Sequence, residues 1–203
     1  MVRVLALIVL LVGAYLVGSI PVGLVIGRSC GFDPRATGSG NIGMTNVARS
    51  GGLGAAGLTF AGDVLKGFVP VIAARWAGFD TVVVAGAGLA AALGAMWSIF
   101  LGFRGGRGVS AGLGIWLGIS PVPVLIAVAV FAGVFAATRI VSLGSISAAI
   151  ALVPAAAALG VARPYLLLAI VMSALVLVRH RANIARLIRA EEPTFRIGHA
   201  GPQ

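Results

Sequence analysis

The chain has 203 residues, of which 60% are hydrophobic and only 10% are charged, and its mean hydropathy is +1.10. Soluble domains carry about 25% charged residues, so this composition excludes an ordinary soluble protein and indicates one integral membrane bundle. The net charge is +10, and Lys66 is the only lysine. Because the charges flank apolar segments, they favour membrane topology and phosphate binding over nucleic-acid binding. Cys30 is the only cysteine, which excludes a disulfide framework and a cysteine metal site.

Seven apolar segments, separated by more polar connections, predict the transmembrane helices. They cover Val4–Ile26, Leu53–Trp76, Thr81–Leu101, Val109–Ile119, Val122–Thr138, Leu143–Gly160 and Tyr165–Val178. The first is too long for a signal-peptide core and is kept as a helix. Residues 109–138 would make one straight helix of about 45 Å, against a core of roughly 30 Å, so Pro121 and Pro123 are expected to split them. We therefore predict an all-α, seven-helix transmembrane bundle forming a single domain over residues 1–203.

The arginines favour seven spans over six. With seven, one face collects Arg28, Arg35, Arg49, Arg104, Arg107, Arg139, Arg179, Arg181, Arg186, Arg189 and Arg196, and the other receives Arg3, Arg75 and Arg163. The positive-inside rule then puts the C-terminus and the glycine-rich loops in the cytoplasm. Residues 179–203 form a basic tail, in which Ile184, Leu187 and Ile188 at helical spacing predict an interfacial helix on an anionic leaflet.

The most informative segment is residues 37–52, TGSGNIGMTNVARSGG, between the first two apolar stretches. Glycine lets backbone amides turn toward one point, and Ser, Thr and Asn add further donors, so the pattern suits a phosphate. A flexible linker is the plainer interpretation, but the apolar Ile42, Met44 and Val47 suggest a packed loop. The candidate binding residues here are Ser39, Gly40, Asn41, Gly43, Thr45, Asn46 and Arg49.

A second segment, residues 103–110, interleaves glycine with arginine just before an apolar helix, which again suits an anion. Positive-inside flanking is its plainer interpretation. Its candidate binding residues are Arg104, Gly105, Gly106, Arg107 and Gly108. A third segment places Asp63 and Lys66 three residues apart within an apolar span, which indicates either a buried structural ion pair or a contact of Lys66 with substrate.

Two further pairs have helical spacing: Ser142 with Ser145, and His180 with Asn183. Each pair alone is more typical of helix caps or an interfacial anchor than of a site. The five carboxylates form no convincing acid–base pair with a nucleophile, and no Ser-His-Asp arrangement is visible.

Taken together, the segments resemble the PlsY family of bacterial acyl-phosphate-dependent glycerol-3-phosphate acyltransferases, from about Gly13 to Glu192. Residues 38–49 resemble the family's GSGNIGATNVLR, and residues 63–67 match its DxxKG. Residues 102–110 are similar to GFKGGKGVA, residues 138–145 to TRYVSLSS, and residues 180–187 to HRENIKRL. Five motifs in order are far more specific than any one of them.

The resemblance implies transfer of a fatty acyl group from acyl phosphate to the 1-hydroxyl of glycerol 3-phosphate, giving lysophosphatidic acid and phosphate, the first step of phospholipid synthesis. No metal or other cofactor is expected. Ser39 and the amides beside it would cradle the acyl phosphate, whose own phosphate would take the hydroxyl proton, with His180 as the rival base. The residues expected around glycerol 3-phosphate are Arg49, Arg107, Ser145, His180 and Asn183, with Ser142 as the alternative to Ser145.

The resemblance also implies a multi-pass protein of the bacterial inner membrane, with the enzyme that makes acyl phosphate as a candidate partner. The chain departs from the family pattern at several places: Arg104 and Arg107 replace lysines, Ala95 and Ser98 replace the His and Pro of GHxFP, Gly144 replaces one serine of TRYVSLSS, and Ala182 replaces a Glu. An organic-phosphate carrier or an inactive lipid-phosphate-binding relative are the alternatives. The short, plain outer connections argue against a carrier, which needs a vestibule on both sides.

Overall fold

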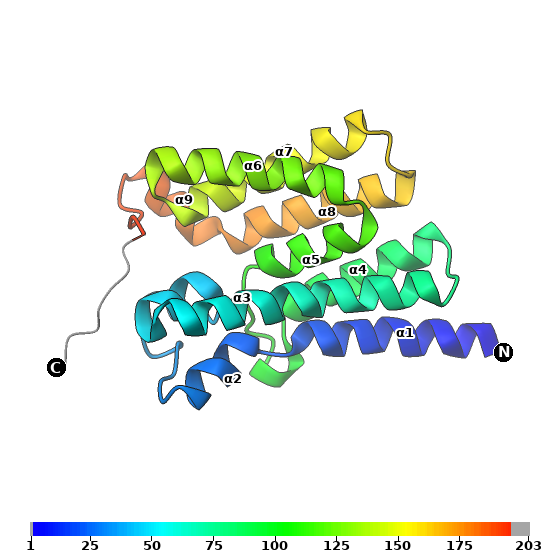
Figure 1. Ribbon diagram of the computed structural model, residues 1–203, viewed down its shortest axis with the longest axis horizontal. Coiled ribbons are helices and arrows are strands. Elements are labelled where there is room, and N and C mark those ends of the chain that lie inside the picture. Colours follow the sequence, from blue (N-terminus) through cyan, green and yellow to red (C-terminus); the bar gives the residue numbers. More distant parts are fainter. Residues whose placement is uncertain (1, 196–203) are drawn as a thin grey trace.

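Nine α-helices and one 3-10 turn make up residues 2–195, the part of the chain that the computed structural model describes (Figure 1). They are α1 Val2–Ser19, α2 Val22–Ser29, α3 Met44–Trp76, α4 Thr81–Met96, the turn Ile99–Leu101, α5 Val109–Ile119, α6 Pro121–Thr138, α7 Val141–Ala158, α8 Arg163–Arg179 and α9 Arg181–Ile188. Every predicted apolar segment lies on helix, and no strand occurs within these residues. The all-α prediction is confirmed.

Not all of the predicted spans are long enough to cross a bilayer. Five stretches of residues 2–195 pass by length and hydropathy, and a sixth does if α8 and α9, which are bent by 62° at their junction, are taken together. Helix α5 has only 11 residues, or about 16 Å, roughly half of the hydrocarbon core. The count of seven spans therefore stays a prediction.

Proline defines two helix boundaries, and one of them differs from the prediction. The segment Val4–Ile26 is not one helix, because α1 ends at Ser19 and α2 begins at Val22, after Pro21. Proline has no N–H to continue a helical ladder. The predicted split in residues 109–138 is confirmed: Ser120 is extended, with φ −157° and ψ 110°, and Pro121 opens α6. Proline suits this position because the first N–H groups of a helix have no partner within the helix, so the absence of one costs no hydrogen bond.

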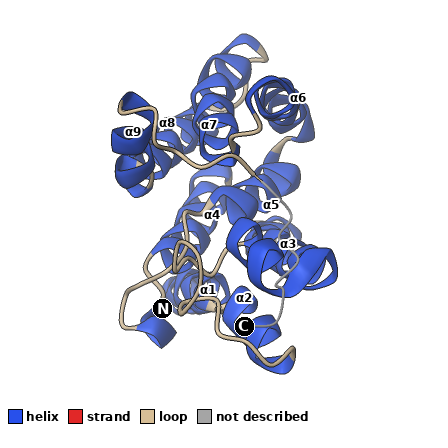
Figure 2. Cartoon of the chain, turned by 90° about the vertical axis from the view of Figure 1, so that its left-hand side faces the viewer, coloured by secondary structure: helices blue, strands red, loops and turns tan. Residues whose placement is uncertain are grey.

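The helices form two groups with α5 between them. Helices α1 to α4 lie in one group and α6 to α9 in the other, as both views show (Figures 1 and 2). Helix α5 is packed directly on α3, because a Cβ on Gly67 would collide with the backbone of Ala111, and one on Gly114 with that of Val64. Such glycine-mediated contact is typical of membrane helices. It holds a helix too short to cross by itself beside one that crosses.

The second half of the glycine-rich segment is helical, which corrects the prediction of a loop over residues 37–52. Helix α3 begins at Met44, and its geometry is interrupted only at Gly52, with φ 77° and ψ −178°. A positive φ of this kind is accessible mainly to glycine. The kink directs the first turns of α3, with Thr45, Asn46 and Arg49, away from the axis of the long helix that follows.

Asp63 and Lys66 form a buried ion pair on α3. Lys66 Nζ lies 2.7 Å from Asp63 Oδ1, and their side chains are 7% and 14% exposed. The same ammonium donates a hydrogen bond to the carbonyl of Ile20, 3.1 Å away, at the break between α1 and α2. The pair therefore ties α3 to the break between α1 and α2, which favours the structural interpretation of this motif.

We expect Lys66→Met to destabilise the protein by about 3 kcal/mol, because it leaves a buried carboxylate unpaired. The apparent Tm in detergent should fall by roughly 10 °C. The double variant Asp63→Leu with Lys66→Met should recover most of the loss, since no unpaired charge remains. A single variant as stable as the parent protein would contradict a structural role for the pair.

Candidate active site

One cavity of about 520 Å³ lies between the two helix groups. One end of it is polar and is lined by loop residues and helix ends. The rest is an apolar groove between α5, α6, α7 and α8, lined by Leu113, Trp116, Val124, Ala127, Val128, Phe131, Ala148, Ala149, Leu152, Met172 and Val176. The groove follows α7 from Ser142 to Leu152, ten residues or about 15 Å of helix, which is half the thickness of a hydrocarbon core.

Most of the predicted site residues meet in this cavity. It is lined by Ser39, Asn41, Gly43, Thr45, Asn46, Arg49, Lys66, Gly106, Arg107, Gly108, Ser142, Ser145, His180 and Asn183. Three predicted residues are not among those that line it. Of these, Gly40 and Arg104 are exposed, and Gly105 contacts its neighbours through its backbone, accepting from Arg179 and donating to the Met96 carbonyl.

The loop before α3 is organised by its own asparagines. Asn46 donates to the carbonyls of Pro34 and Thr37 and accepts from the Ser39 N–H. Asn41 accepts from the Gly43 N–H, and the Gly40 N–H bonds to the Thr37 carbonyl. The amides of Ser39, Gly40 and Gly43, which the prediction assigned to a phosphate cradle, are thus occupied within the loop. Asn46 is buried and acts as the centre of this turn.

The N-terminus of α3 supplies free amides instead. The first helical hydrogen bond here is donated by Asn46 N to Gly43 O, so the N–H groups of Met44 and Thr45 have no partner within the helix. Such amides, together with the positive end of the helix dipole, suit an anion. Arg49, one turn further along, also lines the cavity. The donors available to an anion in this segment are therefore the amides of Met44 and Thr45 and the guanidinium of Arg49, rather than the amides of Ser39, Gly40 and Gly43.

The Arg107 loop, residues 102–108 between the 3-10 turn and α5, is fixed by Arg179, whose only role in the sequence-based prediction is its positive charge. Its guanidinium donates to the Gly105 carbonyl at 2.7 Å and to the Gly106 carbonyl at 3.0 Å, and it stacks over the Trp97 ring at 5.4 Å. The Gly106 N–H bonds to the Ala95 carbonyl at 2.9 Å. These contacts anchor the loop on both sides and direct Arg107 into the cavity. Burial lowers the pKa of Arg107 from its ordinary value.

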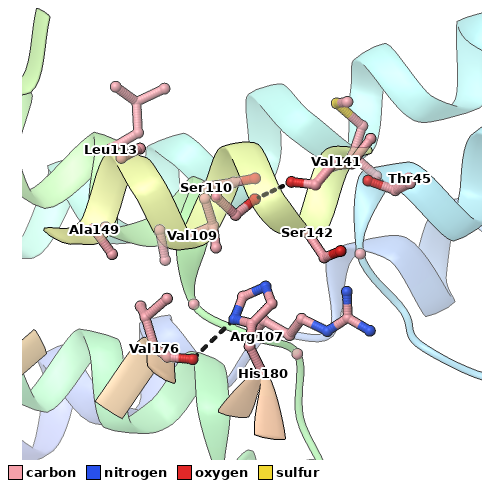
Figure 3. A pocket seen from close by; sticks show the side chains of 18 of the residues that line it. Thr45, Arg107, Val109, Ser110, Leu113, Val141, Ser142, Ala149, Val176 and His180 are labelled. Carbon is pink, nitrogen blue, oxygen red and sulfur yellow. Dashed lines mark hydrogen bonds between the residues drawn. The ribbon is translucent and has the colours of Figure 1, made fainter. Parts of the chain in front are cut away.

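His180 lies beyond the end of α8, at the bend before α9, and is 1% exposed. Its Nδ1 is 2.8 Å from the carbonyl oxygen of Val176 (Figure 3). Because a carbonyl can only accept, Nδ1 carries the proton and Nε2 is the acceptor in the neutral ring. Burial, with the nearby charges of Arg107 and Arg179, lowers the pKa of His180 to about 4. The imidazole is therefore neutral at physiological pH.

Glu192 is the residue that the sequence analysis missed, having left it in the tail. Its side chain is 6% exposed. The hydroxyl of Ser142 and the amide of Asn183 both donate to Oε1, the former at 2.6 Å, and Arg186 Nε donates to Oε2 at 2.7 Å. The tail itself crosses back to the bundle, where Phe195 N bonds to the Arg139 carbonyl and the Phe195 ring packs edge-on against Phe135. No spacing in the sequence connects Glu192 with Ser142, 50 residues away.

Three arginines, Arg49, Arg107 and Arg186, line the polar end of the cavity. A second hollow, of about 460 Å³, adjoins it and shares Ser39, Arg49, Arg107, Arg186 and Pro193 with it. Arginine guanidinium groups offer planar, paired donors that fit phosphate oxygens. Within residues 2–195, no cluster of His, Cys, Asp and Glu has the composition of a metal site. The polar end is therefore suited to phosphate.

Comparison with known proteins identifies the family. A family model described as glycerol-3-phosphate acyltransferase matches residues 8–190. The chain belongs to this family. Relatives named glycerol-3-phosphate acyltransferase include one from Geobacter sulfurreducens, 52% identical over 90% of this chain and 94% of the relative, and one from Aquifex aeolicus, 43% identical over 92% and 97%.

Two solved structures share the fold. Both are crystal structures of PlsY, an integral membrane glycerol 3-phosphate acyltransferase. The glycerol 3-phosphate form has a TM-score of 0.90 and 42% identity, and covers 94% of this chain and 96% of that one. The lysophosphatidic acid form has a TM-score of 0.89 and 41% identity, and covers 95% and 96%. The resemblance to the PlsY family is confirmed.

The fold accommodates the departures from the family pattern. The Ser98 hydroxyl donates to the Ser19 carbonyl at 2.6 Å, and the Ala95 carbonyl accepts from the Arg107 loop. Ala182 is exposed and lines only the second hollow. Arg107 retains its place in the cavity, whereas Arg104 lies on the surface.

We expect the imidazole of His180 to titrate near pH 4, well below the usual 6.5, in ¹⁵N NMR spectra of histidine-labelled protein, with His180→Gln used to assign the signal. The unfolded chain takes up this proton below about pH 6.5 and the folded protein only near pH 4. Acidification between these values should therefore lower the stability of the parent protein more than that of the variant. Titration of His180 at pH 6 or above would contradict the buried, neutral ring.

Proposed function

We propose that this protein transfers a fatty acyl group from acyl phosphate to the 1-hydroxyl of glycerol 3-phosphate, releasing lysophosphatidic acid and inorganic phosphate. The observation that carries the proposal is the single cavity that joins an arginine-lined polar end to an apolar groove. Both substrates have a phosphate, and the donor also has a long hydrocarbon chain. Family membership supports the same reaction.

The two ends of the cavity bind different parts of the substrates. The amides at the N-terminus of α3, with Arg49 and Arg107, hold phosphate groups, and the groove between α5, α6, α7 and α8 holds the acyl chain. Burying apolar chain contributes about 0.8 kcal/mol per methylene, so the groove supplies affinity while the polar end supplies position. Because the short helix α5 begins next to Arg107, the groove opens directly from the phosphate end.

The reaction forms a bond between the 1-hydroxyl oxygen and the acyl carbonyl carbon and breaks the bond from that carbon to the phosphate oxygen. Acyl phosphate is an activated anhydride, so positioning and charge stabilisation can supply much of the rate. A base works best when its pKa is near the working pH, and His180, at about 4, is a weak one. The leaving phosphate of the donor therefore takes the hydroxyl proton, and neutral His180 accepts a hydrogen bond.

We further propose that the protein lies in the bacterial inner membrane, with the polar end of its cavity open to the cytoplasm. Helix α9, the start of α3 and the loop before it lie at one end of the bundle, and the chain's N-terminal helix begins at the other (Figure 1). Most arginines accompany the first end, which supports its cytoplasmic placement by the positive-inside rule. A soluble phosphate acceptor would then enter from the compartment where it is made, and the enzyme that produces acyl phosphate would be the matching donor partner.

The direct test is to give the purified protein palmitoyl phosphate and glycerol 3-phosphate and to follow lysophosphatidic acid and released phosphate together. Equal amounts of both products support the proposal. The same preparation in proteoliposomes should not accumulate labelled glycerol 3-phosphate. Uptake without acylation would favour a carrier, and binding without either would favour an inactive relative.

We expect Arg49→Ala to lower kcat/KM for glycerol 3-phosphate at least about 100-fold while the protein remains folded, because a charge-assisted phosphate contact is lost from a partly buried site. Arg28→Ala is the matched control, since Arg28 is exposed, lies on α2 and does not line the cavity. Both variants are compared by acylation rate and by size-exclusion profile. Undiminished activity in Arg49→Ala would remove Arg49 from the site.

We expect Ala127→Phe to shorten the acyl chain that the protein accepts. Ala127 is buried on α6 and lines the groove, so a phenyl ring there would fill space needed by the distal methylenes. Turnover of palmitoyl phosphate should fall about tenfold or more relative to octanoyl phosphate. Ala132→Phe, on an exposed part of the same helix, should leave the ratio unchanged. An unchanged ratio in Ala127→Phe would place the acyl chain elsewhere.

A further inference from the structure

The carboxylate of Glu192 controls which way its neighbours donate hydrogen bonds. An ionised carboxylate only accepts, so the hydroxyl of Ser142 must give it its single proton, and the amide of Asn183 must turn its NH₂ toward it. The lone pairs of Ser142 Oγ and the Oδ1 of Asn183 are then left as acceptors. Asn183 and Ser142 both line the cavity.

The side chains of Ser145 and His180 also donate to protein neighbours and leave hydrogen-bond acceptors toward the cavity. The Ser145 hydroxyl donates to the Val141 carbonyl at 2.9 Å, and His180 Nδ1 donates to the Val176 carbonyl at 2.8 Å. Each therefore presents an acceptor to the cavity: the Ser145 oxygen lone pairs and His180 Nε2. Together with Ser142 and Asn183 they form an acceptor wall, built from the N-terminal turns of α7 and the bend between α8 and α9. Figure 3 shows His180 and Ser142 from this wall with Arg107 beside them.

Arg49 and Arg107 have the opposite character. A guanidinium has only donors, and it matches phosphate oxygens, which accept. At the acceptor wall, phosphate oxygens would meet the lone pairs of Ser142, Ser145 and His180, next to the negative charge of Glu192. Glycerol hydroxyls, which can donate, suit that wall instead. The cavity thus distinguishes the two ends of a molecule that carries a phosphate at one end and hydroxyls at the other.

We propose that Glu192 is a positioning residue that orients glycerol 3-phosphate, by turning Ser142 and Asn183 into acceptors for its hydroxyls and leaving its phosphate to Arg49 and Arg107. This inference rests on the proposed acyltransferase reaction. It explains how the acceptor is oriented for that reaction, because the hydroxyl end of glycerol 3-phosphate must meet the acyl carbonyl carbon. The role needs a buried, ionised carboxylate held by its neighbours, which Glu192 provides.

The charge state of Glu192 agrees with this role. Burial acts to raise the pKa of the carboxyl, but the hydrogen bonds from Ser142, Asn183 and Arg186 outweigh it, and the pKa is lowered overall. Glu191, its neighbour in sequence, instead pairs with Arg189 at 3.0 Å on the surface, where both side chains are more than half exposed. The two adjacent glutamates therefore differ in environment but not in chemistry, which makes Glu191 a matched control.

The experiment compares Glu192→Gln with Glu191→Gln in two assays, with palmitoyl phosphate saturating. The first measures kcat/KM for glycerol 3-phosphate. The second measures the inhibition constant of inorganic phosphate competing with glycerol 3-phosphate. In Glu192→Gln we expect kcat/KM to fall about tenfold or more while phosphate inhibits at a several-fold lower concentration, because the repelling charge is gone and Arg186 is released. Glu191→Gln should stay within about twofold of the parent protein in both.

These opposite movements separate orientation from simple structural support. A merely loosened site would weaken acceptor turnover and phosphate binding together, and that result would overturn the proposal, as would two unchanged values.

If the parent protein makes no lysophosphatidic acid, the proposed function fails first. If Glu192→Gln does not fold, the parent protein is tested with 3-hydroxypropyl phosphate, which lacks the 2-hydroxyl. A kcat/KM at least about tenfold below that of glycerol 3-phosphate is expected, and equal use of the two acceptors would overturn the acceptor wall.

Discussion

A charge buried in an apolar bundle must find its partner inside the protein, and this constraint shapes the charged parts of the structure. Lys66 pairs with Asp63 and donates to the carbonyl of Ile20. Arg179 satisfies the carbonyls of Gly105 and Gly106. Glu192 is held by Ser142, Asn183 and Arg186. The contacts of Lys66 with Ile20, of Arg179 with Gly105 and of Glu192 with Ser142 join segments 46, 74 and 50 positions apart, so the need to neutralise charge also builds the site.

The site that results has two kinds of asymmetry. Along α7 it changes from arginine-lined to apolar, which would separate the phosphate groups from the hydrocarbon chain. Across its polar end it changes from donors on Arg49 and Arg107 to acceptors on the Ser142 side. The first follows from hydropathy. The second follows from which atom each side chain has already committed to a neighbour, a property of the assembled structure.

Much of the fold could be predicted because it follows from local patterns. Apolar length predicted the helices, and Pro121 predicted the break between α5 and α6. Pro21 is as strong a signal for a break in the first segment, but the hydropathy across it is continuous and predicts one helix where the structure has α1 and α2. The helical start at Met44 was missed for a similar reason, because the glycines around it suggested a loop.

The candidate site was predictable as a set of residues but not as an arrangement. Five ordered motifs indicated which side chains take part, and the cavity contains most of them. They did not indicate that Asn46 and Asn41 serve the loop itself, that Arg179 anchors Arg107, or that the tail carboxylate of Glu192 enters the polar end. These depend on contacts between residues up to 74 positions apart, for which sequence spacing carries no signal.

By itself, the sequence determined the membrane class, the helical content and the chemical character of the site, because each follows from the composition and spacing of neighbouring residues. The tertiary structure alone decided which amides remain free, which arginines face the cavity and which way Ser142 and Asn183 donate. The physical reason is that a hydrogen-bonding group offers a ligand only what its protein neighbours leave over, and those neighbours are assembled only when the helices pack.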